Sequence, residues 1–313
     1  MTAQTILGNV IVQHRFGTAV TAIIAAILLF DIQGVMIKLL GADYSVPQLS
    51  LFRNLFGLLP SVVALYLTAE WHQQGKSWRL ANWRLGLARG VLIAGAQLSF
   101  YKALVNMELA TATTLAFSGP LFITSLSVPL LGHKIGLWRT LAVVLGFAGV
   151  VMVMQPGGDT LNRYTFFAVS AAFFYALVSL SSRFFDRSVP TALISFYTTA
   201  MAAFLMGVVL LATDLWISVP FGIDWLWLMV MGLAGGCAVL LLIMAYRLAD
   251  PSSLSPFEYF GIPFSFILGW LVFNEAPFDK LFPGVLLIVS GGLLVLWRER
   301  QISKRADNVA PPD

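Results

Sequence analysis

Charged residues are scarce in this chain. Only 11% of its 313 residues are Asp, Glu, Lys or Arg, whereas 58% are apolar and the mean hydropathy is +0.84. A soluble domain carries about 25% charged residues, so this chain lacks the side chains needed to cover a surface that faces water. The composition therefore predicts an integral membrane protein whose partner is the lipid bilayer.

Other absences exclude several classes of function. The single cysteine, Cys237, permits neither a disulfide within the chain nor a thiolate metal site. The three histidines, His14, His72 and His133, fall in predicted tails or loops, so no metal site is expected inside the membrane. Basic residues are scattered singly, which argues against nucleic acid as a partner. The chain has no GxxxxGK phosphate loop, so we expect neither ATP coupling nor a cofactor.

Apolar runs long enough to cross a bilayer recur along the whole chain. A helix needs about 20 mostly apolar residues to span the hydrocarbon core. Glycine, proline and polar residues separate these runs, as at Gly41-Ala42-Asp43. The pattern predicts an all-α membrane protein with ten transmembrane helices, at residues 17–40, 47–69, 83–105, 110–131, 137–154, 163–185, 190–211, 223–247, 252–273 and 279–297.

Lys and Arg fall unevenly on the two sides of these spans. Of the 19 basic residues, 13 lie on the side of the N-terminus and four on the other side, while Arg53 and Arg89 lie inside spans. Cytoplasmic loops carry the excess of Lys and Arg in membrane proteins. We therefore expect both termini to lie in the cytoplasm.

The two halves of the sequence share landmarks. A shift of 143 residues aligns Pro47 with Pro190, Pro120 with Pro263 and Gly149 with Gly292. Each half holds five predicted spans, an odd number, so the second half enters the membrane from the opposite side. Inverted repeats of this kind are typical of secondary transporters. We place the first repeat at 1–156, the second at 157–300 and a cytoplasmic tail at 301–313.

The sequence resembles the EamA family of the drug/metabolite transporter superfamily. The stretch from Tyr101-Lys102-Ala103-Leu104 to Pro120 and the segment from Gly146 to Gly158 carry the resemblance. It implies a bacterial inner-membrane protein in which predicted helices 1, 3, 4, 6, 8 and 9 surround a central cavity. Helices 5 and 10 would lie at the periphery, where a second subunit could pack to form a homodimer.

Four ionisable residues fall inside predicted spans, where an unpaired charge is costly. By depth, Asp31 lies within about one helical turn of Arg53, and Arg89 and Glu258 lie equally far from the cytoplasmic side. We predict two ion pairs, Asp31–Arg53 and Arg89–Glu258, that form and break as the cavity opens to alternate sides. One alternative is that these pairs are permanent and structural, and another is that Arg53 and Arg89 simply extend toward the headgroups.

Polar side chains on the predicted cavity helices are candidates for binding a substrate's polar ends, with Phe117, Phe174 and Phe260 flanking its apolar part. A structural alternative stands beside this reading, because Ser and Thr often bond their own helix and Tyr often lies at the membrane interface. The candidates are Gln33, Gln97, Tyr101, Thr114, Ser118, Tyr175, Ser179, Tyr246 and Tyr259.

Small residues and prolines predict how the helices pack. Gly86-x-x-x-Gly90 and Gly232-x-x-x-Gly236 each place two glycines on one helix face, which lets a neighbouring helix approach closely. Pro120 and Pro263 remove backbone hydrogen bonds within predicted helices 4 and 9. We expect kinks at these prolines and place both helices beside the cavity.

Together these features predict a secondary transporter rather than an enzyme. The favoured substrate is an amino acid, including aromatic ones, or a similar small metabolite, exported by alternating access as in the YddG-like exporters of the superfamily. The alternative within the fold is an importer of a larger metabolite such as S-adenosylmethionine or riboflavin. A polytopic membrane enzyme or a scaffold is the alternative of another class, although no catalytic cluster is found.

Overall fold

The computed structural model describes residues 3–73, 75, 77–131, 137–154, 162–181, 184–186, 189–248, 254 and 257–307. Within these ranges the side chains at 3–15, 70, 120, 127–128, 131, 138–139, 243, 246–247, 295–296 and 298–307 are not described.

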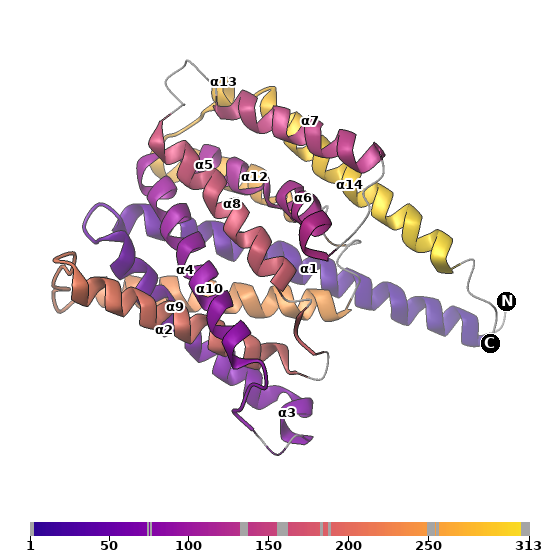
Figure 1. The fold of residues 1–313 in the computed structure, drawn as a ribbon, viewed down its shortest axis with the longest axis horizontal. Coiled ribbons are helices and arrows are strands. Elements are labelled where there is room, and N and C mark those ends of the chain that lie inside the picture. Colours follow the sequence, from indigo (N-terminus) through magenta and orange to yellow (C-terminus); the bar gives the residue numbers. More distant parts are fainter. Residues whose placement is uncertain are drawn as a thin grey trace.

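The described chain is a bundle of helices (Figure 1). The first half contains α1 Ala3–Leu40, α2 Val46–Leu67, α3 Ala69–Gln73, α4 Trp83–Asn106, α5 Leu109–Ala116, α6 Gly119–Leu131 and α7 Leu137–Met154. The second half contains α8 Arg163–Ser181, α9 Thr191–Ala212, α10 Ile223–Leu248, α12 Gly261–Phe273, α13 Phe278–Leu281 and α14 Gly284–Asp307.

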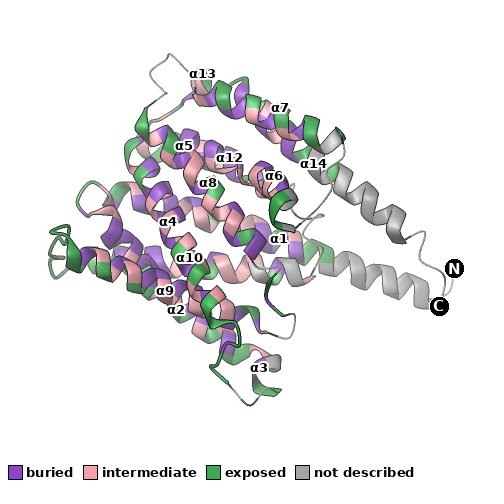
Figure 2. Ribbon diagram, in the orientation of Figure 1, coloured by how far each residue is buried: buried purple, intermediate pink, exposed green. Residues whose placement is uncertain are grey.

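The outer faces of this bundle are apolar. Six segments are long and apolar enough to cross a membrane, and three shorter apolar helices accompany them among the described residues. Many large apolar side chains are exposed, including Leu211, Leu67 and Val144. Exposed positions, in green, recur along the helices (Figure 2). Exposed apolar surface on this scale marks contact with lipid rather than water. The chain is therefore a multi-pass membrane protein.

The predicted spans at 110–131 and 252–273 are not continuous helices. The first is interrupted by a turn at Phe117-Ser118 between α5 and α6, and the second by a turn at 259–260, just before α12. Pro120 and Pro263 consequently lie in the first turn of α6 and α12, where a missing amide hydrogen costs no intrahelical bond. The expected kinks are thus replaced by breaks, at matching positions in the two halves.

Helices of the two halves interlock. If α1, α2, α4, α5–α6 and α7 correspond to α8, α9, α10, α12 and α14, every major contact between the halves has its counterpart. The α1–α10 contact matches α8–α4, and α2–α10 matches α9–α4. The α2–α9, α5–α12 and α7–α14 contacts map onto themselves. Helices α7 and α14 pack together along one edge of the bundle (Figure 1).

The glycine pairs pack as predicted. A Cβ atom on Gly90 of α4 would lie 2.9 Å from the Thr198 carbonyl oxygen of α9. A Cβ atom on Gly236 of α10 would lie 3.1 Å from the Gly57 carbonyl oxygen of α2. Both glycine pairs therefore allow close backbone approach, at the two contacts that correspond in the halves.

Side-chain contacts show at which end of the bundle the segments that connect the helices lie. At one end, the Tyr44 hydroxyl donates to Asp224 at the start of α10 (2.6 Å), and Lys38 of α1 meets Glu275 beyond α12. Burial, followed by the hydrogen bond to Asp224, raises the pKa of Tyr44 to about 12. At the opposite end, the α2–α4 connection packs on the start of α9, and here α1 begins and α14 ends (Figure 1).

Candidate functional site

A cavity of about 200 Å³ lies inside the bundle. Helix α1 contributes Asp31 and neighbours one turn away on either side, and α4, α5 and α10 supply most of the remaining wall. Both helix breaks border this cavity, because Ala116 and Phe117 lie at the end of α5 and Glu258 lies just before the turn at 259–260. Discontinuous helices at a central site are typical of secondary transporters. The described lining is Ile27, Phe30, Asp31, Gly34, Phe100, Leu104, Leu109, Thr113, Ala116, Phe117, Leu242 and Glu258.

Asp31 is the unusual group in this wall. Only 7% of its surface is exposed, and its Oδ2 atom is buried with no hydrogen-bond partner among the described residues. A buried polar oxygen without a partner typically costs about 1–3 kcal/mol. The carboxyl group is therefore ready to accept a hydrogen bond or a positive charge from a molecule in the cavity.

Neither predicted ion pair occurs among the described residues. Arg53 donates to the Asn54 side-chain oxygen (3.2 Å) and not to Asp31. Arg89 donates to the Val178 carbonyl oxygen and to the Ser181 hydroxyl (2.9 Å), so α4 is tied to α8 by neutral acceptors. The depth of these residues could be read from their positions in the spans, but their directions around the helix axes could not.

A buried amide network joins α2 to α4. The Gln97 Oε1 atom accepts hydrogen bonds from Ser50 and Asn54, both at 2.7 Å, and Gln97 donates in return to Asn54 at 3.2 Å. Nearby, Gln33 of α1 donates to the Tyr101 hydroxyl at 3.2 Å. Gln33, Gln97 and Tyr101 are thus brought close to the middle of the bundle, although none of them lines the described cavity.

Several other candidates are not among the described residues that line the cavity. The Tyr259 hydroxyl packs against Gly292 of α14, where an added Cβ would clash with it, and Ser179 is exposed on α8. Ser118 donates to the Leu115 carbonyl oxygen at the helix break, and Thr114 is fully buried. The ring of Tyr175 meets Phe100 edge-on, 6.4 Å between centroids. The side chains of Tyr246 and Pro120 lie outside the described set.

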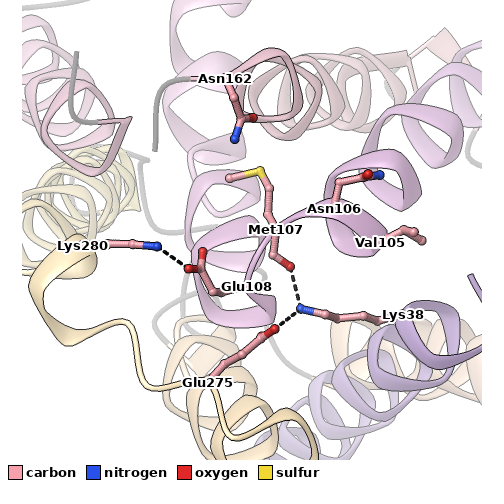
Figure 3. Close-up of a pocket in the computed structure, with 8 residues that line it drawn as sticks. All are labelled: Lys38, Val105, Asn106, Met107, Glu108, Asn162, Glu275 and Lys280. Atoms are coloured by element: carbon pink, nitrogen blue, oxygen red, sulfur yellow. Dashed lines mark hydrogen bonds and ion pairs between the residues drawn. The ribbon is translucent and has the colours of Figure 1, made fainter. Parts of the chain in front are cut away.

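Four charged residues form an ion-pair cluster at one end of the bundle (Figure 3). Lys38 of α1 pairs with Glu275 at 2.5 Å and donates to the Met107 carbonyl oxygen at 2.6 Å. Lys280 of α13 pairs with Glu108, between α4 and α5. Each pair joins a residue of the first half to one of the second half. The cluster borders a second cavity of about 400 Å³, which opens at this end.

The segment from Leu104 to Leu109 separates the two cavities. Leu104 and Leu109 line the inner cavity, whereas the residues between them line the outer one. The Glu275 carboxylate also accepts a hydrogen bond from the Leu109 backbone amide at 3.0 Å. The ion pairs therefore fasten this partition to α1, α12 and α13. Along α1, Lys38 lies about 10 Å beyond Asp31.

The Glu108 carboxyl remains ionised in this cluster. Burial raises its pKa, but the hydrogen bond from Lys280, with the charges of Lys280 and Lys38, outweighs burial and holds the pKa below the ordinary value of 4.5. Lys38 also lies over the Phe273 ring, 4.8 Å from its centroid. Glu108 is thus paired with Lys280 as a carboxylate at neutral pH.

Sequence reasoning missed this cluster. Lys38 and Lys280 count only among the four basic residues on the sparsely basic side of the membrane, and Glu108 and Glu275 fall between the predicted spans. A signal was available, because the four lie at predicted span ends on one side and carry balanced charge. Their pairing could not be inferred, since the partners are 237 and 172 positions apart.

Comparisons with known proteins place this geometry in a family. The model of the EamA-like transporter family matches the chain twice, over residues 17–155 and 162–297. This chain belongs to the EamA-like transporter family. It is accordingly a membrane transporter and not an enzyme.

Relatives of this EamA-family protein include a riboflavin transporter and an S-adenosylmethionine uptake transporter. It is 29% identical over 255 residues to the riboflavin transporter of Vibrio cholerae, covering 81% of this chain and 82% of the relative. It is 25% identical over 274 residues to the S-adenosylmethionine uptake transporter of Rickettsia prowazekii, covering 87% and 90%. A solved crystal structure shares its fold, with a TM-score of 0.63 at 22% identity over 91% of this chain and 99% of the other.

Proposed function

We propose that this EamA-family protein takes up a cofactor-sized metabolite, of the kind carried by the riboflavin and S-adenosylmethionine transporters, across a bacterial inner membrane. The observation that carries this proposal is the inner cavity, which lies at both helix breaks and combines aromatic rings with two carboxyl groups. A mostly apolar pocket with a few placed polar groups suits an amphipathic solute. Relatives of both substrate classes align over more than 80% of the chain.

The proposed topology has ten membrane crossings in two inverted repeats, with both termini cytoplasmic. The exchange of contacts between the halves supports two repeats related by an approximate two-fold axis. The excess of Lys and Arg on the side of the N-terminus supports the orientation. In this orientation the ion-pair cluster faces the outside of the cell.

The proposed mechanism is alternating access. The two ion pairs and the 104–109 partition close the cavity toward the outside in this conformation. Opening that side requires both pairs to break, and because each pair joins the two halves, it requires the halves to move apart. The closed state is thereby favoured until the substrate or the opposite gate shifts the equilibrium.

Amino-acid export, the function favoured by the sequence, has less support than uptake of a larger metabolite. The named relatives reported above carry riboflavin or S-adenosylmethionine. Export of amino acids is therefore the competing outcome of the experiment below. The expected homodimer through α7 and α14 stays a prediction, to be checked by light scattering in detergent.

The deciding experiment is flux in proteoliposomes made with the purified protein. Labelled riboflavin, S-adenosylmethionine and a panel of amino acids that includes Phe, Tyr and Trp would be tested for saturable uptake and counterflow, beside protein-free liposomes. We expect saturable flux of a cofactor-class solute and none of amino acids. Saturable flux confined to amino acids would overturn the proposal and restore the export function.

A further inference from the structure

We propose that the inner cavity binds an organic cation, with Asp31 as the counter-ion of a positively charged, alkylated sulfonium or ammonium centre. This inference rests on the proposed transport function and names its substrate class. Asp31 meets the requirement for a binding group: it lines the cavity, is more than nine-tenths buried, and has an Oδ2 atom without a partner among the described residues.

The charge of the wall favours a cation. Its ionisable members among the described lining residues are Asp31 and Glu258, both acidic. Arg53, the closest basic residue in depth, is bonded to Asn54 on α2 and is not part of this wall. Because the effective dielectric constant inside a protein is lower than in water, the Asp31 carboxylate attracts a positive group more strongly there than it would in solution.

The rest of the wall favours a weakly hydrated cation. Phe30, Phe100 and Phe117 reach the cavity from α1, from α4 and from the break after α5. Aromatic faces attract alkylated cations through their ring quadrupoles and stack on planar groups. Thr113 is the one uncharged hydroxyl among the described lining residues. This composition suits an onium centre, which needs no hydrogen-bond acceptors, attached to an apolar or planar body.

The size of the cavity limits how much of the solute is held. Its volume of about 200 Å³ is below the ~300–1,000 Å³ of pockets that enclose a drug-sized ligand. In this conformation it therefore accommodates the charged centre and its nearest groups. The remainder of a cofactor-sized solute requires the cavity to widen, as it does when one gate opens.

Among the two substrate classes of the relatives, this site selects the cationic one. S-adenosylmethionine carries a sulfonium ion, whereas riboflavin is uncharged at neutral pH. S-adenosylhomocysteine supplies a matched ligand, because it differs from S-adenosylmethionine by the loss of one methyl group and of the sulfonium charge. The pair isolates the charged centre from the rest of the molecule.

The test is equilibrium binding to the purified full chain in detergent by isothermal titration calorimetry. We expect wild-type protein to bind S-adenosylmethionine about tenfold or more tightly than S-adenosylhomocysteine. Asp31→Asn, which keeps the shape and removes the charge, should bring the two affinities within about threefold. Asp31→Glu should retain the preference. Asp214→Asn, at an exposed position between α9 and α10, is the matched control and should behave as wild type.

The outcomes separate this inference from the proposed function. Equal affinity of wild-type protein for the two ligands, or a preference that survives Asp31→Asn in protein with unchanged thermal unfolding, would overturn the cation site. If liposomes then show saturable riboflavin flux, the transport function stands without it. A preference that depends on Asp31, in protein that moves no solute, would support the site and reject the transport function.

Discussion

Two sets of charges in this protein are held in opposite ways. At one end of the bundle, Lys38, Glu275, Lys280 and Glu108 form two ion pairs that join the halves. In the interior, Arg53 and Arg89 are bonded by amide, carbonyl and hydroxyl groups of their own neighbours. Ion pairs near water can form and break at modest cost, whereas buried neutral contacts are costly to disrupt. We therefore expect the ion-pair cluster to rearrange during transport and the contacts of Arg53 and Arg89 to stay intact.

Reversal of one charge in the ion-pair cluster should have the largest effect, on the accessibility of the inner cavity. Lys38→Glu places two carboxylates side by side, which we expect to disfavour the closed outer side by about 3 kcal/mol, or more than 100-fold. A cysteine at Thr113, in a Cys237→Ser background, should then react with a membrane-impermeant maleimide added from outside.

Two further variants are controls for the labelling of Lys38→Glu. The double change Lys38→Glu/Glu275→Lys should restore protection, and Lys102→Glu should leave it unchanged, because Lys102 contacts the Phe167 ring and forms neither of the two pairs. Labelling that stays equally slow in Lys38→Glu would show that the cluster does not close the cavity.

Disruption of the interior network should cost stability rather than accessibility. Gln97→Leu leaves Asn54 and Ser50 with unsatisfied groups, for an expected loss of roughly 2–3 kcal/mol. The measurement is thermal unfolding in detergent, with Asn106→Ala as a control, since Asn106 is exposed and bonds only its own helix. Equal losses in the two variants would contradict a special role for the network.

Substitution of a glycine at a helix contact should have a smaller effect on stability. Gly236→Ala puts a Cβ atom 2.7 Å from Pro60 and 3.1 Å from the Gly57 carbonyl oxygen, so α10 must shift away from α2. We expect a loss of roughly 1–2 kcal/mol in thermal unfolding. Gly207→Ala meets nothing within 4 Å and should be neutral or slightly stabilising, because alanine favours the helix. A neutral Gly236→Ala would show that the close approach is dispensable.

The smallest effect concerns pH at the partly exposed Lys280–Glu108 pair. Because the folded-state pKa of Glu108 is lowered, its contribution is present above about pH 4.5 and is lost as the pH falls through the folded value. The difference in unfolding free energy between wild type and Glu108→Gln, obtained from thermal unfolding, should be constant from pH 5 to 7 and below about 1 kcal/mol. The difference should vanish at lower pH. A difference that grows on acidification would show that folding raises the pKa of Glu108 rather than lowering it.

Local patterns predicted the helices and their closest contacts. Each predicted span contains a helix among the described residues, because a backbone in lipid must satisfy its own hydrogen bonds and apolar length reveals where it does so. The glycine pairs on α4 and α10 also found helix partners. The same reasoning expected kinks at the prolines, although Ser118-Gly119-Pro120 in the first half contains residues that favour a turn.

The direction of each side chain around its helix axis determined which groups it contacts. Asp31 and Gln33 are two residues apart, which rotates them by about 200°, so Asp31 faces the cavity while Gln33 bonds Tyr101. The depth of Asp31 in α1 was readable from the sequence, but which neighbour it faces depends on how α1 packs against α4, α10 and α12. The membrane class and the apolar helices were determined by the sequence itself, because lipid acts on each segment separately. The cavity, the unpartnered carboxyl group and the ion pairs were decided by tertiary structure, since they join groups that no local pattern relates.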